Sequence, residues 1–86
     1  MAIYVNRFCN TLDELLEETG VSCYQISQYS GLDGGYLSRL RSGQKKNPSP
    51  ETIMKISLAL VHYSDKVKLF DVEALFKATG RTLLHA

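Results

Sequence analysis

The sequence lacks a long hydrophobic run, and its first residues show neither the charged nor the apolar region of a signal peptide. No apolar segment approaches the roughly 18–20 residues that a membrane-spanning helix needs. We therefore expect a cytoplasmic protein that has no membrane partner.

Cysteine and histidine are also scarce. Cys9 and Cys23 are the only cysteines, and His62 and His85 lie far from them, so the spacing of a zinc site is missing. In a reducing cytosol both thiols should be free. Cys23 is either a small packing residue or a thiol activated near a helix N-terminus. The chain also lacks a nucleophile–base pair and a phosphate-cradling glycine loop. We expect no metal, no other cofactor and no enzyme activity.

Acidic residues are absent between Gly34 and Pro50, although the net charge of the chain is only +1. The basic residues of that stretch are Arg39, Arg41, Lys45 and Lys46. The acids gather earlier, at Asp13, Glu14, Glu17 and Glu18. This segregation predicts one acidic and one basic end, and a basic end attracts a polyanion. Two ordinary solvated charge clusters explain the same pattern equally well.

The 86 residues and the hydrophobic content of 44% fit one folded domain, residues 1–86. Helical spacing and capping signals predict five helices, over residues 12–19, 23–30, 34–42, 50–62 and 72–79. The residues expected to cap them are Thr11 with Glu14, Ser22 with Gln25, Asp33, Ser49 and Asp71. The predicted fold class is a compact all-α domain.

The domain divides into three parts on this reading. Residues 1–10 carry no helical period and are expected to form an N-terminal arm, with a possible extended segment at 2–6. Residues 11–62 hold helices one to four, with Met54 among the apolar residues of the fourth. Residues 63–86 hold the fifth helix and a C-terminal tail, and Leu75 and Phe76 should point inward.

The second and third predicted helices have the spacing of a helix-turn-helix. Gly31 suits a turn that needs a positive φ. The apolar residues that would fix the angle between the helices are Ile26, Leu32, Leu37 and Leu40. The helix after the turn would then expose small or polar side chains to base edges. Ordinary helical pairs share this spacing, so the pattern favours DNA binding without establishing it.

Residues 11–62 resemble the phage-repressor-like helix-turn-helix family, the Cro/XRE type. The resemblance rests on GVS at 20–22, GL at 31–32, YLSRL at 36–40, SG at 42–43 and NPSPET at 47–52. It covers roughly 60% of the chain and implies a five-helix, lambda-repressor-like domain. It further implies sequence-specific binding of double-stranded DNA, usually as a dimer, in the regulation of transcription.

The resemblance also suggests which residues meet DNA. The expected base contacts are Gly34, Gly35, Ser38 and Arg39. The expected phosphate contacts are Ser22, Cys23, Tyr36, Arg41, Ser42, Gln44, Lys45, Lys46 and Asn47. Arg39 is the main candidate for base readout, because a guanidinium can bond both acceptors of guanine. A surface arginine that pairs with a phosphate or an acid is the alternative.

The chain departs from the family pattern at several positions. Gly34 and Gly35 leave two usual reading positions without side chains, so either the backbone approaches DNA closely or few bases are read. Arg41 replaces a common acid and should add positive charge beside the groove. Ser27 and Ser30 replace apolar residues, which predicts looser packing of the second helix.

The leading hypothesis is a DNA-binding transcriptional regulator, most readily a repressor, that inserts residues 34–42 into the major groove. The alternative is a protein-interaction module or antitoxin-like partner that uses the same fold. A homodimer through residues 63–86 is also expected. The apolar residues proposed for that interface, or else for the core, are Leu69, Phe70, Val72, Phe76, Leu83 and Leu84.

Overall fold

The computed structural model describes residues 7–80, and these residues form five α-helices and no strand. The helices are α1 (Arg7–Thr19), α2 (Cys23–Ser30), α3 (Gly34–Ser42), α4 (Pro50–Tyr63) and α5 (Leu69–Lys77). The predicted all-α class is therefore confirmed. The extended segment expected at 2–6 and the tail residues Leu83 and Leu84 lie outside the described residues. Within 7–80, no helix is both long and apolar enough to span a bilayer.

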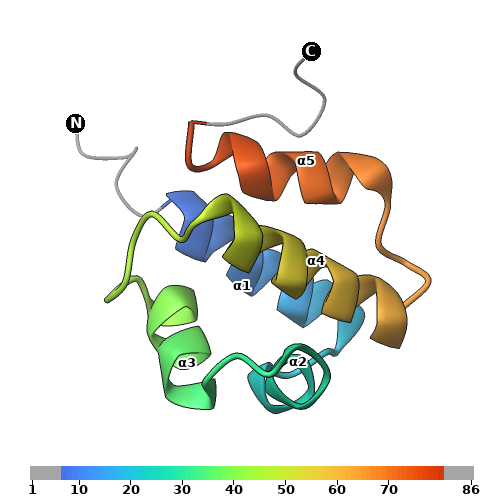
Figure 1. Ribbon diagram of the computed structural model, residues 1–86. Coiled ribbons are helices and arrows are strands. Elements are labelled where there is room, and N and C mark those ends of the chain that lie inside the picture. Colours follow the sequence, from blue (N-terminus) through green and yellow to red (C-terminus); the bar gives the residue numbers. More distant parts are fainter. Residues whose placement is uncertain (1–6, 81–86) are drawn as a thin grey trace.

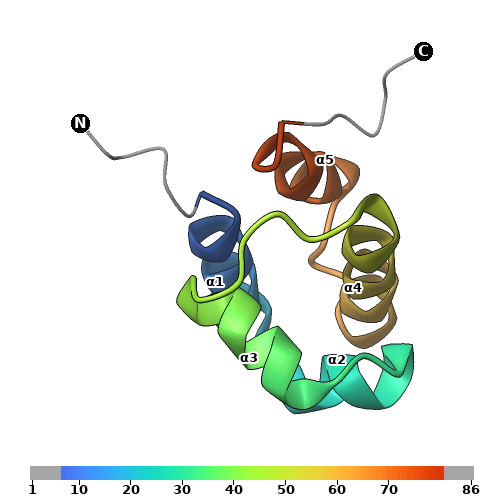
Figure 2. The ribbon, with the colours of Figure 1, turned by 60° about the vertical axis from the view of Figure 1, so that its left-hand side comes forward.

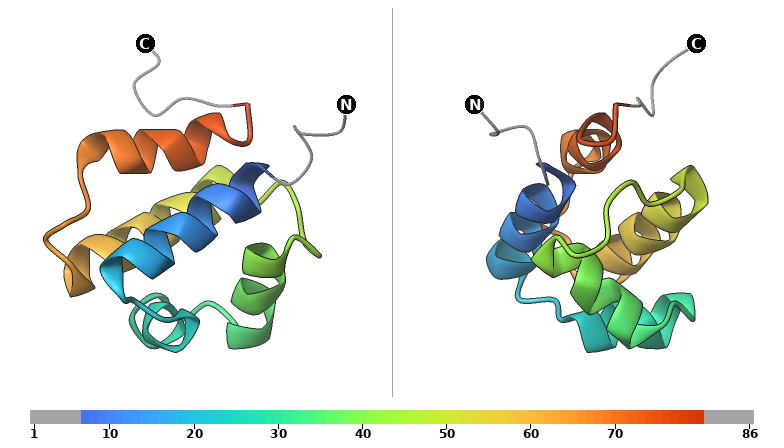
Figure 3. Two further views of the ribbon diagram at one scale, coloured as in Figure 1. Left: turned by 180° about the vertical axis from the view of Figure 1, so that it is seen from behind. Right: turned by 90° about the vertical axis from the view of Figure 1, so that its left-hand side faces the viewer.

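The helices are stacked so that α1 and α4 occupy the middle of the molecule (Figure 1). Helix α5 covers one side of this pair, and α2 and α3 cover the other (Figure 3). Helix α3 packs on α1 and α2 packs on α4, whereas α5 contacts both middle helices (Figure 2). The helix-turn-helix is thus supported from behind by α1 and α4.

One hydrophobic core joins all five helices. Its buried apolar residues are Phe8, Leu12, Leu15, Leu16, Val21, Ile26, Leu37, Leu40, Ile53, Ile56, Ala59, Leu60, Val72, Leu75 and Phe76. Burial of this apolar surface is the main favourable contribution to folding. Ser57 is a buried polar residue of α4, and its Oγ donates to the carbonyl oxygen of Ile53 at 2.8 Å, so its hydroxyl is satisfied.

Helix α1 begins earlier than predicted. It starts at Arg7, so residues 7–10 belong to the helix and not to an arm, and Thr11 lies inside α1 instead of capping it. The cause is Phe8, which is buried four residues before Leu12 and extends the apolar stripe by one turn. This first turn was not predicted, because a single aromatic residue, Phe8, was the only apolar residue that indicated it.

The observed bounds of α2, α3 and α4 agree with the bounds predicted from the sequence to within one residue. Ser22 accepts the N–H of Gln25 at 3.1 Å while Gln25 Oε1 accepts the N–H of Ser22 at 3.0 Å, so the predicted capping box is confirmed. Asp33 and Ser49 cap α3 and α4 as expected. Met54 was wrongly placed on the buried face of α4, because it is 36% exposed.

Helix α5 also begins earlier than predicted, at Leu69. Lys68 is its N-cap residue, and Asp71 is the third helical residue, whose Oδ2 accepts the Lys68 N–H at 2.8 Å. Asp71 therefore stabilises the start of the helix from inside its first turn. Leu75 and Phe76 point into the core as predicted.

Candidate nucleic-acid interface

The turn between α2 and α3 is fixed by two serine side chains and one glycine. Gly31 has a φ of 80°, and its N–H donates to the Ser27 carbonyl at 2.9 Å. Ser27 Oγ donates to the Leu32 carbonyl at 2.7 Å. Ser30 Oγ donates to the Ile26 carbonyl at 2.6 Å and accepts the Leu32 N–H at 3.1 Å. The expectation that these serines loosen α2 is thus wrong, because their hydroxyls bind the backbone of the turn.

Helix α3 keeps one face in the core and leaves the other open. Leu37 and Leu40 are fully buried. The residues predicted to contact bases, namely Gly34, Gly35, Ser38 and Arg39, are all exposed. Arg39 forms no salt bridge with any described side chain of residues 7–80. The open face of α3 therefore offers one guanidinium, one hydroxyl and two bare backbone positions.

The two glycines have different surroundings. A Cβ on Gly34 would meet only Ser27 Oγ, at 3.9 Å. A Cβ on Gly35 would lie 3.1 Å from Asp33 Oδ2 and 3.4 Å from an Nη atom of Arg39. Since side chains of a helix lean toward its N-terminus, the absent side chain at Gly35 leaves room for Arg39 one turn later. Gly34 has no comparable packing reason to be glycine.

Replacing Gly34 with alanine is expected to raise the free energy of unfolding by about 0.4–1 kcal/mol, because it restricts the unfolded chain without a clash. Gly35→Ala should stabilise less, since its methyl group presses on Asp33 and Arg39. Urea denaturation of the two variants measures this difference. A larger gain for Gly35→Ala would contradict it. If Gly34→Ala also weakens DNA binding, the backbone at Gly34 approaches the DNA closely.

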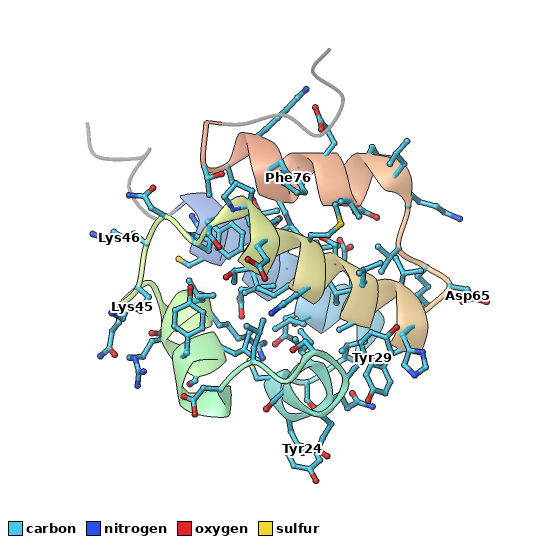
Figure 4. All side chains as sticks on the ribbon, in the orientation of Figure 1. Tyr24, Tyr29, Lys45, Lys46, Asp65 and Phe76 are labelled. Atoms are coloured by element: carbon cyan, nitrogen blue, oxygen red, sulfur yellow. The ribbon has the colours of Figure 1, made fainter. Side chains whose placement is uncertain are left out.

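The loop after α3 holds its lysines on an ordered backbone. Gly43 has a φ of 93°, and the N–H groups of Gly43 and Lys45 both donate to the Arg39 carbonyl at 3.1 Å. Pro48 is fully buried and anchors the far end of the loop. Lys45 and Lys46 are exposed and project from the edge of the molecule (Figure 4).

The other loop residues predicted to meet phosphate are also exposed: Ser42, Gln44 and Asn47. The Gln44 N–H approaches Ser42 Oγ at 3.4 Å, and Asn47 has a positive φ of 56°, which asparagine tolerates better than most residues. Neither Lys45 nor Lys46 has a salt bridge to a described side chain of residues 7–80. The loop thus presents two unpaired cations on a hydrogen-bonded scaffold.

Arg41 lies on the side of α3 that faces α1. Its Nε donates to Asp13 Oδ1 at 2.7 Å and its Nη2 to Glu17 Oε2 at 2.8 Å. The hydrogen bond to Asp13 raises the pKa of Arg41 above its ordinary value, against a smaller opposing effect of burial. Two of the four clustered acids thus lie against the basic helix α3, so the acids do not gather at one separate end. The charge of Arg41 expected beside the groove is offset by these carboxylates.

Arg41→Gln is expected to lower the free energy of unfolding by about 1 kcal/mol, because two partly exposed ion pairs between α1 and α3 are lost. High salt should reduce this difference, since exposed pairs are screened. Lys55→Gln, which breaks the exposed Lys55–Glu51 pair within α4, is the matched control and should cost less. Urea denaturation at low and high salt measures the free energy of unfolding of each variant. Equal losses of this free energy in both variants would contradict a stabilising contact of Arg41 between α1 and α3.

The start of α2 holds two of the expected phosphate contacts. Ser22 is exposed and Cys23 is half-buried at the first position of the helix. Tyr24 follows them and is 71% exposed, with its side chain projecting from the body of the molecule (Figure 4). The sequence analysis missed Tyr24. Its position after two expected phosphate contacts, on the helix that crosses the DNA backbone in this motif, could have indicated it.

Within residues 7–80, no three His, Cys, Asp or Glu side chains come together as metal ligands. The described residues form a helix-turn-helix that is followed in the chain by a basic loop. A sequence model described as Cro/C1-type HTH DNA-binding domain matches residues 11–61. The chain belongs to this family. The resemblance noted from its motifs is therefore confirmed. Searches of curated proteins and of solved structures found no match.

The Cro/C1-type match covers α2, α3 and most of α1 and α4, and it ends before α5. The family is a DNA-binding one. The assignment of individual residues to bases and phosphates stays a prediction. Of those residues, Arg41 is the one whose charged group is already engaged within the domain.

Proposed function

We propose that the protein regulates transcription, as a repressor, by inserting α3 into the major groove of a specific DNA site. The observation that carries this proposal is Arg39, which is exposed and forms no salt bridge with residues 7–80, on a helix whose other face is fixed in the core. A guanidinium in the groove discriminates guanine by about 1–3 kcal/mol. With Gly34 and Gly35 beside it, Arg39 carries most of the sequence readout, and Ser38 adds a hydroxyl.

Phosphate contacts come from two places that flank α3. Lys45 and Lys46 lie in the loop after it, together with Ser42, Gln44 and Asn47. Ser22, Cys23 and Tyr24 lie at the start of α2, where helix N–H groups attract an anion. Tyr36 is half-buried against the core, so only its hydroxyl is available for a phosphate contact. These contacts fix orientation and supply affinity, while base readout supplies specificity.

Selection of binding sites from a pool of random DNA duplexes tests the proposal directly. We expect the full chain to enrich a short common sequence that contains guanine, and its affinity to fall steeply with salt. Equal weak binding to every duplex would contradict sequence-specific regulation. The direction of regulation is then tested by placing the selected site over a promoter, where a repressor lowers transcription.

We further propose that two copies bind DNA together through α5. Leu69 is 61% exposed and borders a shallow apolar hollow at the start of this helix. Val72 and Phe76 are buried in the core and are not available to a second copy. In a dimer of this kind the two α3 helices lie about 34 Å apart, one turn of DNA. Sedimentation of Leu69→Ser against the unchanged chain tests the pairing; a monomer in both cases would refute it.

A further inference from the structure

A groove of about 220 Å³ runs between α1 and α5. It is lined by Thr11, Glu14, Leu15 and Glu18 of α1 and by Phe70, Asp71 and Ala74 of α5. The apolar residues among these are Leu15, Ala74 and Phe70, whereas Glu14, Glu18 and Asp71 contribute carboxylates and Thr11 a hydroxyl. A groove with both apolar and acidic lining residues suits a ligand that carries both apolar and cationic side chains.

The carboxylates of Glu14 and Glu18 have no role within the described fold. Both side chains are exposed, and neither forms a salt bridge with a described residue of 7–80. They lie four residues apart on α1, where like charges destabilise a helix by a few tenths of a kcal/mol. Asp13 and Glu17 differ, because both form ion pairs with Arg41. The two glutamates are therefore not explained by the stability of the domain.

Phe70 makes the groove more than an acidic patch. It is 72% exposed at the first turn of α5 and borders this groove on one side and the apolar hollow at Leu69 on the other. A large exposed aromatic residue costs solubility and is typical of the centre of a protein interface. An aromatic ring also attracts a lysine or arginine side chain through its face.

The charges decide which partner fits. A second copy that presented the same groove would bring Glu14, Glu18 and Asp71 against themselves, and such like-charge contacts are unfavourable. A DNA duplex is repelled for the same reason. Helix α5, which forms one wall of the groove, lies on the opposite side of the molecule from α2 and α3 (Figures 1 and 3). A partner in the groove would therefore not compete with DNA bound at α3.

We propose that the α1–α5 groove binds a basic amphipathic segment of a different protein. Apolar side chains of that segment pack on Leu15, Phe70 and Ala74, and its lysines or arginines pair with Glu14, Glu18 and Asp71. The DNA-bound domain then holds a partner on its far side. This inference does not depend on DNA binding, because the groove and the open face of α3 share no residue.

Selection from a displayed library of random short peptides, with the full chain as target, provides the probe. We expect the enriched peptides to combine apolar residues at helical spacing with lysine or arginine. The strongest peptide is then synthesised with a fluorescent label, and its affinity is measured by anisotropy. Glu14→Gln with Glu18→Gln should weaken it by about tenfold, and Phe70→Ala by a similar factor.

The controls are Glu51→Gln and Leu58→Ala on α4, which remove an exposed carboxylate and an exposed apolar residue elsewhere and should leave the peptide affinity unchanged. Circular dichroism checks that each variant is folded. The glutamine variant should also bind the selected DNA site as the unchanged chain does.

Enrichment of acidic or uncharged peptides, or equal losses of peptide affinity in the α4 controls, overturns the proposal. Loss of a dimer on Glu14→Gln with Glu18→Gln also overturns it, because the groove is then occupied by a second copy.

Discussion

Replacing Leu40 with alanine is expected to lower the free energy of unfolding by about 2–5 kcal/mol. Leu40 is completely buried and lies on the inner face of α3, in the core that joins this helix to α1 and α2. The loss combines the transfer of the removed atoms to water with the cavity that remains. A domain of this size is stable by only about 5–15 kcal/mol, so the variant should be close to unfolding.

Leu58→Ala is the matched control, because it removes the same atoms from an exposed position on α4. Thermal denaturation followed by circular dichroism should show a midpoint lower by about 10–30 °C for Leu40→Ala and little change for Leu58→Ala. Similar midpoints for the two variants would show that α3 is not anchored through Leu40. DNA binding by Leu40→Ala should be lost as the domain unfolds and recover on cooling.

Replacing Arg39 with alanine is expected to weaken binding to the selected DNA site by roughly 5- to 150-fold, which corresponds to about 1–3 kcal/mol. The guanidinium is exposed and unpaired among the described residues, so its removal leaves the fold intact. Binding to unrelated duplexes should fall much less, because only the base contact carries sequence information. Arg39→Lys keeps the charge but loses the paired donors, and it should not restore specificity.

Lys45→Ala should behave differently from Arg39→Ala. It removes one phosphate contact, so it weakens binding to every duplex alike and reduces the slope of log affinity against log salt by about 0.9. Lys55→Ala, on α4 and paired with Glu51, is the control and should change neither quantity. Equal losses of specificity in Arg39→Ala and Lys45→Ala would contradict the division between base readout and phosphate contact. Titrations at several salt concentrations measure both effects.

Local signals in the sequence were sufficient for the central part of the fold. The helix-turn-helix is bounded by residues whose effect is short-range: the capping box at Ser22, the left-handed Gly31, and the caps Asp33 and Ser49. Each acts within four residues of its own position, so its effect can be read without tertiary information. The match of residues 11–61 to the Cro/C1-type family confirms the motif as a whole.

The errors arose where the fold depends on distant contacts. The first turn of α1 forms because Phe8 is buried, and α5 begins at Leu69 although no strong cap precedes it. The pairing of Arg41 with Asp13 joins residues far apart in the sequence, and no local pattern announces it. The serines of α2 were judged by the loss of apolar packing, whereas their hydroxyls bind the turn. Tertiary contacts decide the start of α1, the start of α5 and the pairing of Arg41, whereas the serine hydrogen bonds are local and span four or five residues.

The most direct test of DNA recognition through α3 is amide chemical-shift mapping during titration of the labelled full chain with the selected duplex. We predict that the largest changes fall on α3 from Gly34 to Arg39, on the loop from Gln44 to Asn47, and on Ser22 to Tyr24. The amides that line the α1–α5 groove should change little. Changes centred on α1 and α5, with none on α3, would contradict recognition of DNA through the helix-turn-helix.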